Sequence, residues 1–123
     1  MKYLKMELRY MDNLKDNSYY LKKIITDITF IIEKTKGLTQ EELEDNEILV
    51  DSVMFRLIQI SENSNKLTDD FKSCHSTIPW RAIKGMRNKI VHEYGGVVLS
   101  VIFDTIKTDL PKLIGQLTEI MEH

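Results

Sequence analysis

The stretch LKKIITDITFII, Leu21 to Ile32, decides the fold class of this chain. Its apolar residues recur three or four positions apart, the spacing that gathers side chains on one face of an α-helix. A half-buried β-strand would instead alternate apolar and polar residues. Gly37 follows Lys34 and Lys36, so we predict an amphipathic helix that ends there. The predicted buried stripe comprises Leu21, Ile24, Ile25, Ile28, Ile31 and Ile32.

Helical signals continue through the middle of the chain. Thr39 followed by Glu42 is a capping box, which predicts a short helical turn. Asn46 is placed to cap a long helix over about residues 47–67. The segment TDDFKSCHSTIP, Thr68 to Pro79, is expected to be the longest loop. The inward-facing residues of the long helix are predicted to be Leu49, Val53, Leu57, Ile60 and Leu67.

Two more helices are predicted after this loop. Pro79 suits the first turn of one helix, because its missing N–H leaves no hydrogen bond unmade there. That helix should end near Gly95–Gly96. The last helix is expected over residues 98–121, with a kink near residues 107–110 caused by Pro111. The expected apolar positions are Trp80, Ile83, Met86 and Ile90 in the first, and Val98, Val101, Ile102, Thr105, Ile106, Leu110, Leu113, Ile114, Leu117 and Met121 in the second.

The 123 residues are predicted to form one all-α domain, an antiparallel bundle of four to five helices. Residues 1–16 are expected to extend the first helix. The apolar positions are generous for one small bundle, which favours a homodimer. No apolar run approaches the roughly 20 residues that cross a bilayer, the N-terminus lacks a signal-peptide pattern, and Cys74 stands alone. These features predict a cytoplasmic protein without membrane contact.

Charge is distributed unevenly along the chain. The net charge is −2, yet the 22 residues between Asp70 and Glu93 contain no acid. This window is either a solvated helix face or a local patch that binds anions. Its basic residues and histidines are Lys72, His75, Arg81, Lys84, Arg87, Lys89 and His92.

The stretch RNKIVHEY, Arg87 to Tyr94, lies at the end of this window. A histidine can take or give a proton near neutral pH, and an arginine can stabilise charge on a phosphate. Together they suit RNA cleavage by the ribose 2′-hydroxyl. On an ideal helix His92 lies about 40° from Asn88 but about 140° from Arg87, so a groove would have to collect both side chains. By itself an Arg-x4-His spacing is also compatible with an ordinary solvated helix.

The segment PWRAIKGMRNKIVHEYGGV, Pro79 to Val97, resembles the signature of the HepT-like family of the HEPN superfamily. The likeness rests on Pro79-Trp80, on the run Gly85 to Asn88, and on the pattern Arg-x4-His-x-Tyr. It extends to QISENSNKL, Gln59 to Leu67, and to the Asp-Leu-Pro sequence of the last helix. Gly96-Val97 departs from the usual family pattern, and so do Ser61 and Asn63, which flank Glu62 where the family has small residues.

The resemblance implies a HEPN-like helical homodimer that is a toxin and a metal-independent endoribonuclease. Arg87 and His92 would be its catalytic pair, with Asn88 beside them. Glu62 is a candidate supporting residue, although its place in mid-helix equally suits a buried carboxylate with a structural partner. Arg81, Lys84 and Lys89 are candidate contacts for RNA phosphates. The implied partner is a MntA-like nucleotidyltransferase antitoxin, which would silence the toxin by attaching AMP to Tyr94.

From the same pattern we expect an RNA substrate, no DNA, no metal and no cofactor. Two other functions stay open. The chain could be a non-catalytic regulatory subunit that binds nucleotide or the nucleotidyltransferase, or a plain helical dimerisation module. Arg87 and His92 in a window without acids favour the ribonuclease over the plain module. RNA cleavage by the purified protein would separate the ribonuclease from the regulatory subunit.

Overall fold

The computed structural model describes residues 16–93 and 99–122. All regular structure in these two ranges is helical, which confirms the all-α prediction. Residues 1–15 of the predicted N-terminal extension, Tyr94 and Gly95–Gly96 lie outside the described residues. The elements are α2 (Asn17–Thr35), α3 (Gln40–Glu44), α4 (Glu47–Asn65), α5 (Asp69–Cys74), α6 (Trp80–His92), α7 (Leu99–Asp104), the π-helical segment η2 (Thr105–Asp109) and α8 (Leu110–Glu122).

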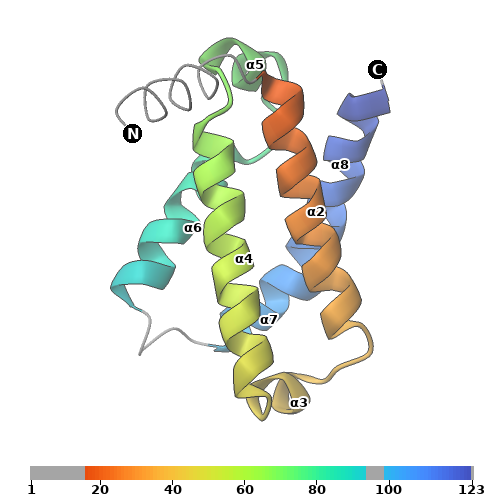
Figure 1. The fold of residues 1–123 in the computed structure, drawn as a ribbon, viewed down its shortest axis with the longest axis vertical. Coiled ribbons are helices and arrows are strands. Elements are labelled where there is room, and N and C mark those ends of the chain that lie inside the picture. Colours follow the sequence, from red (N-terminus) through yellow and green to blue (C-terminus); the bar gives the residue numbers. More distant parts are fainter. Residues whose placement is uncertain (1–15, 94–98, 123) are drawn as a thin grey trace, which may run out of the picture.

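Helices α2 and α4 lie side by side and antiparallel at the centre of the molecule (Figure 1). α6 packs on α4 and α8 packs on α2, so α6 and α8 lie on opposite sides of the central pair. The short helix α3 makes the connection from α2 to α4. No helix in the described ranges is both long and apolar enough to cross a bilayer.

The core is aliphatic and follows the predicted stripes, with small departures. Ile25 and Ile32 of α2 are only half-buried, as is Leu49 of α4, although all three pack against the core. Val101 was expected to face inward, but 55% of it is exposed. Each fully buried leucine or isoleucine stabilises the fold by about 1.5–3 kcal/mol. The largest fully buried aliphatic residues are Ile24, Ile28, Ile31, Leu43, Val53, Leu57, Ile60, Ile90, Ile106 and Leu117.

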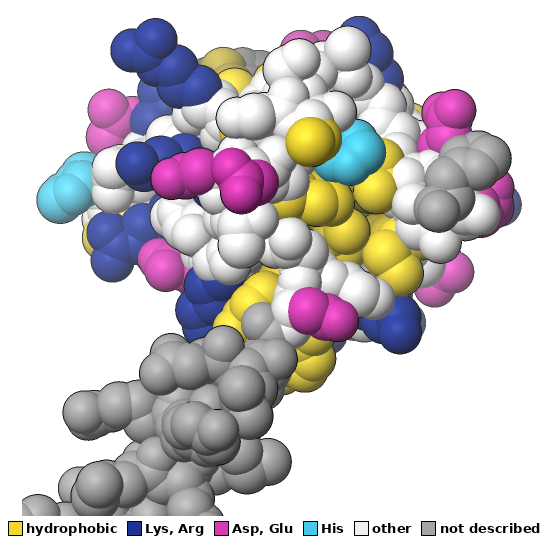
Figure 2. All heavy atoms as spheres, turned by 90° about the horizontal axis from the view of Figure 1, so that it is seen from above, with side chains coloured by type: hydrophobic (Ala, Val, Ile, Leu, Met, Phe, Trp, Pro, Cys, Tyr) yellow, Lys and Arg dark blue, Asp and Glu magenta, His cyan; other side chains and the backbone are white. Residues whose placement is uncertain are grey.

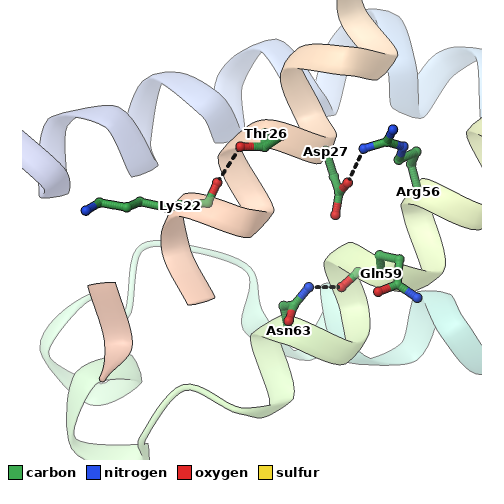
Figure 3. A network of polar contacts seen from close by, with 6 residues as sticks. All are labelled: Lys22, Thr26, Asp27, Arg56, Gln59 and Asn63. Atoms are coloured by element: carbon green, nitrogen blue, oxygen red, sulfur yellow. Dashed lines mark hydrogen bonds and ion pairs between the residues drawn. The ribbon is translucent and has the colours of Figure 1, made fainter. Parts of the chain in front are cut away.

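A charged pair is built into the contact between α2 and α4 (Figure 3). Nη1 of Arg56 lies 2.7 Å from Oδ1 of Asp27, whose side chain is 12% exposed. The Arg56 guanidinium also lies 4.0 Å from the centroid of the Phe30 ring, a cation–π contact. Because an unpaired buried carboxylate is costly, the pair favours the arrangement of α2 and α4 in which Asp27 and Arg56 stay in contact.

The predicted helix starts in the first half of the chain are confirmed. The Glu42 amide donates to Oγ1 of Thr39, and the Thr39 amide donates to Oε1 of Glu42, both at 3.1 Å. The bonds from the Thr39 amide and hydroxyl lower the pKa of Glu42. Asn46 caps α4, because its Oδ1 accepts from the Leu49 amide at 3.1 Å. The capping box therefore begins α3, and Asn46 begins the helix that carries Glu62.

The segment predicted as a loop contains helix α5, so that prediction was wrong in part. Thr68 caps this helix by accepting at Oγ1 from the Phe71 amide, 3.2 Å away. Asp69 and Asp70 lie in its first turn, where negative charge is favourable. Nδ2 of Asn17 donates to the Thr68 hydroxyl at 3.1 Å, and the Thr68 amide donates back to Asn17 at 3.0 Å. The start of α5 is thereby attached to the start of α2.

The boundaries of α6 also differ from the prediction. Pro79 is the residue that precedes the helix rather than a member of its first turn. The helix ends at His92 instead of near Gly95–Gly96, and the Glu93 amide donates to the Lys89 carbonyl at 3.0 Å. Val91, His92 and Glu93 are all exposed, so packing does not hold a further turn. His92 is consequently a terminal residue of the helix.

The last predicted helix is divided into α7, η2 and α8 rather than simply kinked. Pro111 lacks an N–H, and its ring crowds the carbonyl four residues earlier, that of Lys107. The wider π-helical turn at Thr105–Asp109 lies just before this proline. Within this turn Nζ of Lys107 donates to the Thr35 carbonyl at 2.7 Å, where α2 ends. The irregular turn thus provides a cation for the C-terminus of α2.

Candidate active site

Helix α6 faces the core with a narrow apolar side and presents the rest of its surface to solvent. Ile83 and Ile90 are buried. Trp80 is half-buried, and its Nε1 donates to the His75 carbonyl at 3.1 Å, so it belongs to the packing as expected. The exposed polar residues of the helix are Arg81, Lys84, Asn88, Lys89 and His92.

The side chain of Arg87 turns toward α4. Its Nε lies 3.0 Å from Oε1 of Glu62, and the two side chains are 42% and 45% exposed. Its Nη1 donates to Oδ1 of Asn88 at 3.3 Å. An ion pair this exposed contributes little to stability, but it orients the guanidinium. The structure thus brings together Arg87, Asn88 and Glu62.

A second contact joins α4 to α6 next to this pair. The hydroxyl of Ser61, which is fully buried, donates to the Lys84 carbonyl at 3.2 Å. Ser64, one turn further along α4, donates to the Ser61 carbonyl at 2.9 Å. Sequence reasoning noted Ser61 only as a departure from a family pattern and gave it no part in the site. Its position among the inward-facing residues of α4 was the available signal.

His92 is exposed at the end of α6. No hydrogen bond or ion pair joins it to Arg87 within residues 16–93 and 99–122, in keeping with the predicted angular separation of the two. Its neighbour in the motif, Tyr94, lies outside the described residues, so the structure does not place the predicted acceptor of AMP. The His92 imidazole and the Arg87 guanidinium of one chain therefore lie apart on α6. A site that uses both would have to bring them to the same phosphate.

Basic side chains gather toward one edge of the molecule (Figure 2). A histidine side chain lies at that edge, with Lys and Arg side chains near it and Asp and Glu side chains among them (Figure 2). Arg81, Lys84 and Lys89 are all exposed on α6, and no acid occurs between Asp70 and Glu93. An anion that approaches this helix meets positive charge supplied by several residues.

One hollow lies along this helix. A groove of about 770 Å³ runs between α6 and the α7–α8 segment, with Met86 and Ile102 among its apolar residues and Lys89 and Glu93 at the end nearest His92. A second hollow of about 700 Å³ is lined by Phe71, His75, Ile78 and Ile120, among others. Figure 2 shows exposed hydrophobic side chains beside a histidine side chain on the face seen from above.

Within the described ranges, no three His, Cys, Asp or Glu side chains come together in a group that could hold a metal ion. Cys74 is an exposed free cysteine. The polar groups gathered around Arg87 are a carboxylate, an amide and a guanidinium. The guanidinium and the amide can donate hydrogen bonds to an anion, and the imidazole of His92 can transfer a proton.

Comparison with known proteins identifies the family. The family model described as "Ribonuclease HepT-like" matches residues 24–120. The chain belongs to the HepT-like family. That match includes α4, α6 and most of α8, and so contains every candidate site residue from Glu62 to Tyr94. No solved structure matches significantly.

Relatives of this HepT-like chain carry ribonuclease names. "Putative RNase TTE0752" of Caldanaerobacter subterraneus subsp. tengcongensis is 36% identical over 84% of this chain and 92% of the relative. "Probable ribonuclease HepT" of Thermococcus cleftensis is 35% identical over 82% of this chain and 92% of the relative. "Gamma-glutamylcyclotransferase and putative RNase MJ0434" of Methanocaldococcus jannaschii is 33% identical over 89% of this chain, which spans only 49% of that relative.

Proposed function

We propose that this protein is a metal-independent endoribonuclease and the toxin of a toxin–antitoxin pair. The observation that carries the proposal is the Arg87 guanidinium, held by Glu62 at 3.0 Å and Asn88 at 3.3 Å on the exposed basic helix that ends at His92. Membership of the HepT-like family and the ribonuclease names of the relatives support the same reaction class.

The residues of α6 match the needs of RNA cleavage by an internal nucleophile. The ribose 2′-oxygen attacks the adjacent phosphorus and loses its proton, while the bond from phosphorus to the 5′-oxygen breaks and that oxygen gains a proton. The products are a 2′,3′-cyclic phosphate and a 5′-hydroxyl. His92 would serve one of the two proton transfers, and Arg87 would stabilise the charge that builds on the phosphate oxygens. DNA lacks the 2′-hydroxyl and would not be cleaved.

Charge around this pair favours a polyanionic substrate. Arg81, Lys84 and Lys89 are exposed on the same helix as Arg87 and would contact phosphates on either side of the one that is cleaved. Such contacts position RNA without reading its bases. We therefore assign them to binding rather than to the chemical step.

We further propose that two copies associate so that both motifs line one cleft. Within one copy, Arg87 turns toward α4, whereas His92 lies at the exposed end of α6. In a dimer, an arginine and a histidine from different copies could contact the same phosphate. Light scattering during size-exclusion chromatography should give the mass of a dimer. A monomer at micromolar concentration would contradict the shared cleft.

Silencing would come from a MntA-like nucleotidyltransferase that transfers AMP from ATP to Tyr94. The added phosphodiester places negative charge two residues from His92 and would repel RNA phosphates. Regulation of this kind explains how a cell could tolerate the nuclease.

Incubation of the purified protein with RNA tests the proposal. We expect cleavage to a 2′,3′-cyclic phosphate that persists in EDTA, and no cleavage of a substrate with a 2′-deoxy sugar at the cut position. Loss of activity in EDTA would end the metal-independent mechanism. Complete absence of cleavage, together with tight binding to the nucleotidyltransferase, would favour the non-catalytic regulatory subunit.

A further inference from the structure

We infer that Ser61 and Glu62, adjacent residues of α4, position the catalytic arginine of α6. The inference rests on the proposed function, since it names the groups that hold Arg87 for the reaction. Ser61 bonds the backbone of α6 at Lys84, and Glu62 bonds the side chain at Arg87. Neither residue needs to touch RNA for this role.

The two contacts act at different levels of the helix. The Ser61 hydroxyl donates to the Lys84 carbonyl, the same oxygen that accepts from the Asn88 amide in a regular helix. Glu62 holds the guanidinium one turn further along α6. Consecutive residues of α4 thus hold α6 at two positions that are one turn apart. Two such contacts oppose both sliding and rotation of α6 against α4.

The close fit at Ser61 leaves little freedom. Ser61 is fully buried, Ser64 is 1% exposed, and α4 and α6 pack along this seam. Small side chains let the two helix backbones approach, and a larger residue would push them apart. The Ser61 bond can therefore form only when α6 is at its proper distance from α4.

The contacts of Arg87 also select which part of it is presented to RNA. A guanidinium has five N–H donors in a planar fork. Glu62 lies against the Nε–H, and Asn88 accepts from one N–H of Nη1. A phosphate would meet the edge formed by Nη1 and Nη2, where two parallel hydrogen bonds can form. By holding Nε–H, Glu62 thus fixes which edge of the Arg87 guanidinium faces RNA.

Glu62 could either position Arg87 for the reaction or compete with RNA for it, and these two roles predict opposite effects on cleavage. If Glu62 only competed with RNA for the guanidinium, Glu62→Ala would bind RNA more tightly and cleave faster. If Glu62 positions Arg87, Glu62→Ala should lower kcat by about 10- to 100-fold, the scale expected when a reacting group is misplaced. The same variant should leave KM unchanged or lower it, because a negative charge has been removed.

The experiment compares Glu62→Ala with Glu62→Gln and Ser61→Ala in steady-state RNA cleavage, which gives kcat and KM for each variant. Glutamine retains an oxygen that can accept from Nε–H, so Glu62→Gln should keep most of the rate that Glu62→Ala loses. Ser61→Ala should lower kcat by a smaller factor with KM unchanged. Glu47→Ala, an equal loss of charge in the first turn of the same helix, is the matched control and should cleave like wild type.

A second measurement does not depend on activity. The NMR signal of the Arg87 Nε–H, identified by its absence in Arg87→Lys, should exchange slowly with water in wild type and Glu62→Gln, and rapidly in Glu62→Ala. Equal kcat and equal exchange in all variants would overturn the positioning role. If the exchange rates change as expected but wild type fails to cleave RNA, the contact is real and the proposed ribonuclease function is wrong.

Discussion

Nε of Arg87 lies 3.0 Å from Oε1 of Glu62, and this ion pair links the motif helix α6 to α4. The two residues come from two of the segments in which the sequence resembles the HepT-like family, QISENSNKL and PWRAIKGMRNKIVHEYGGV. One segment provides the arginine, and the other provides the carboxylate that orients it. Residues from two separate stretches of the family signature, Glu62 and Arg87, therefore meet in one cluster on the surface.

Replacement of His92 by alanine should abolish RNA cleavage without loss of stability. We expect at least a 100-fold lower rate, the usual contribution of a general acid or base. His92 is exposed, so the free energy of unfolding should change by less than about 0.5 kcal/mol. His75→Ala is the matched control, because His75 packs against the Phe71 ring in another part of the molecule. Equal cleavage by the two variants would remove His92 from the mechanism.

Arg87 and Arg81 should differ in the kinetic constant that each one controls. Arg87→Ala should lower kcat by roughly 100-fold or more, because charge on the reacting phosphate loses its stabilisation. Arg81→Ala should instead raise KM and reduce the salt dependence of RNA binding by about one unit of slope. Both changes remove one charge from α6, so the comparison separates chemistry from electrostatic attraction. A similar rise in KM with unchanged kcat for both variants would make Arg87 a binding residue.

The helical spacing of the sequence predicted α2 and α4 well because their burial is regular. Ile24, Ile28 and Ile31 recur at helix spacing, and all three are buried. Helix α5 escaped prediction because it is six residues long and none of them is buried, so it leaves no periodic signal. The π-helical turn escaped because Pro111 indicates a disturbance but not the form that it takes.

The sequence suggests which residues form the candidate site, but it does not predict the contacts that they make. The pattern around Arg87 and His92 selected the residue types that phosphate chemistry needs. Helical geometry also indicated that the two side chains do not share a face. The partner of Arg87 depends on how α4 crosses α6, which no spacing within α6 specifies. Ser61 was overlooked for the same reason, since its hydroxyl bonds a backbone carbonyl of another helix.

Removal of Arg56 should destabilise the fold without acting on the site. Arg56→Ala leaves the largely buried Asp27 carboxylate without its ion pair, and we expect a loss of about 1–3 kcal/mol in the free energy of unfolding. Changing both residues, as in Asp27→Asn with Arg56→Met, should recover part of the loss. Lys22→Ala, which removes an exposed cation from α2, is the control and should have little effect. Equal denaturation midpoints for Arg56→Ala and Lys22→Ala would contradict a structural role for the pair.

The last prediction concerns Tyr94, which follows the end of α6 by two residues. With the cognate nucleotidyltransferase and ATP, the Tyr94 hydroxyl oxygen should attack the α-phosphorus of ATP and release pyrophosphate. The protein should gain the mass of one AMP group, which peptide mapping should place on Tyr94, and RNA cleavage should fall in proportion. Tyr94→Phe should cleave RNA, resist modification and stay toxic in cells that carry the partner. Tyr20→Phe is the control, because Tyr20 is 8% exposed in α2 and its loss should leave modification unchanged. If Tyr94→Phe were modified as readily as wild type, the acceptor would be another residue, and the charge introduced beside His92 could not be the cause of silencing.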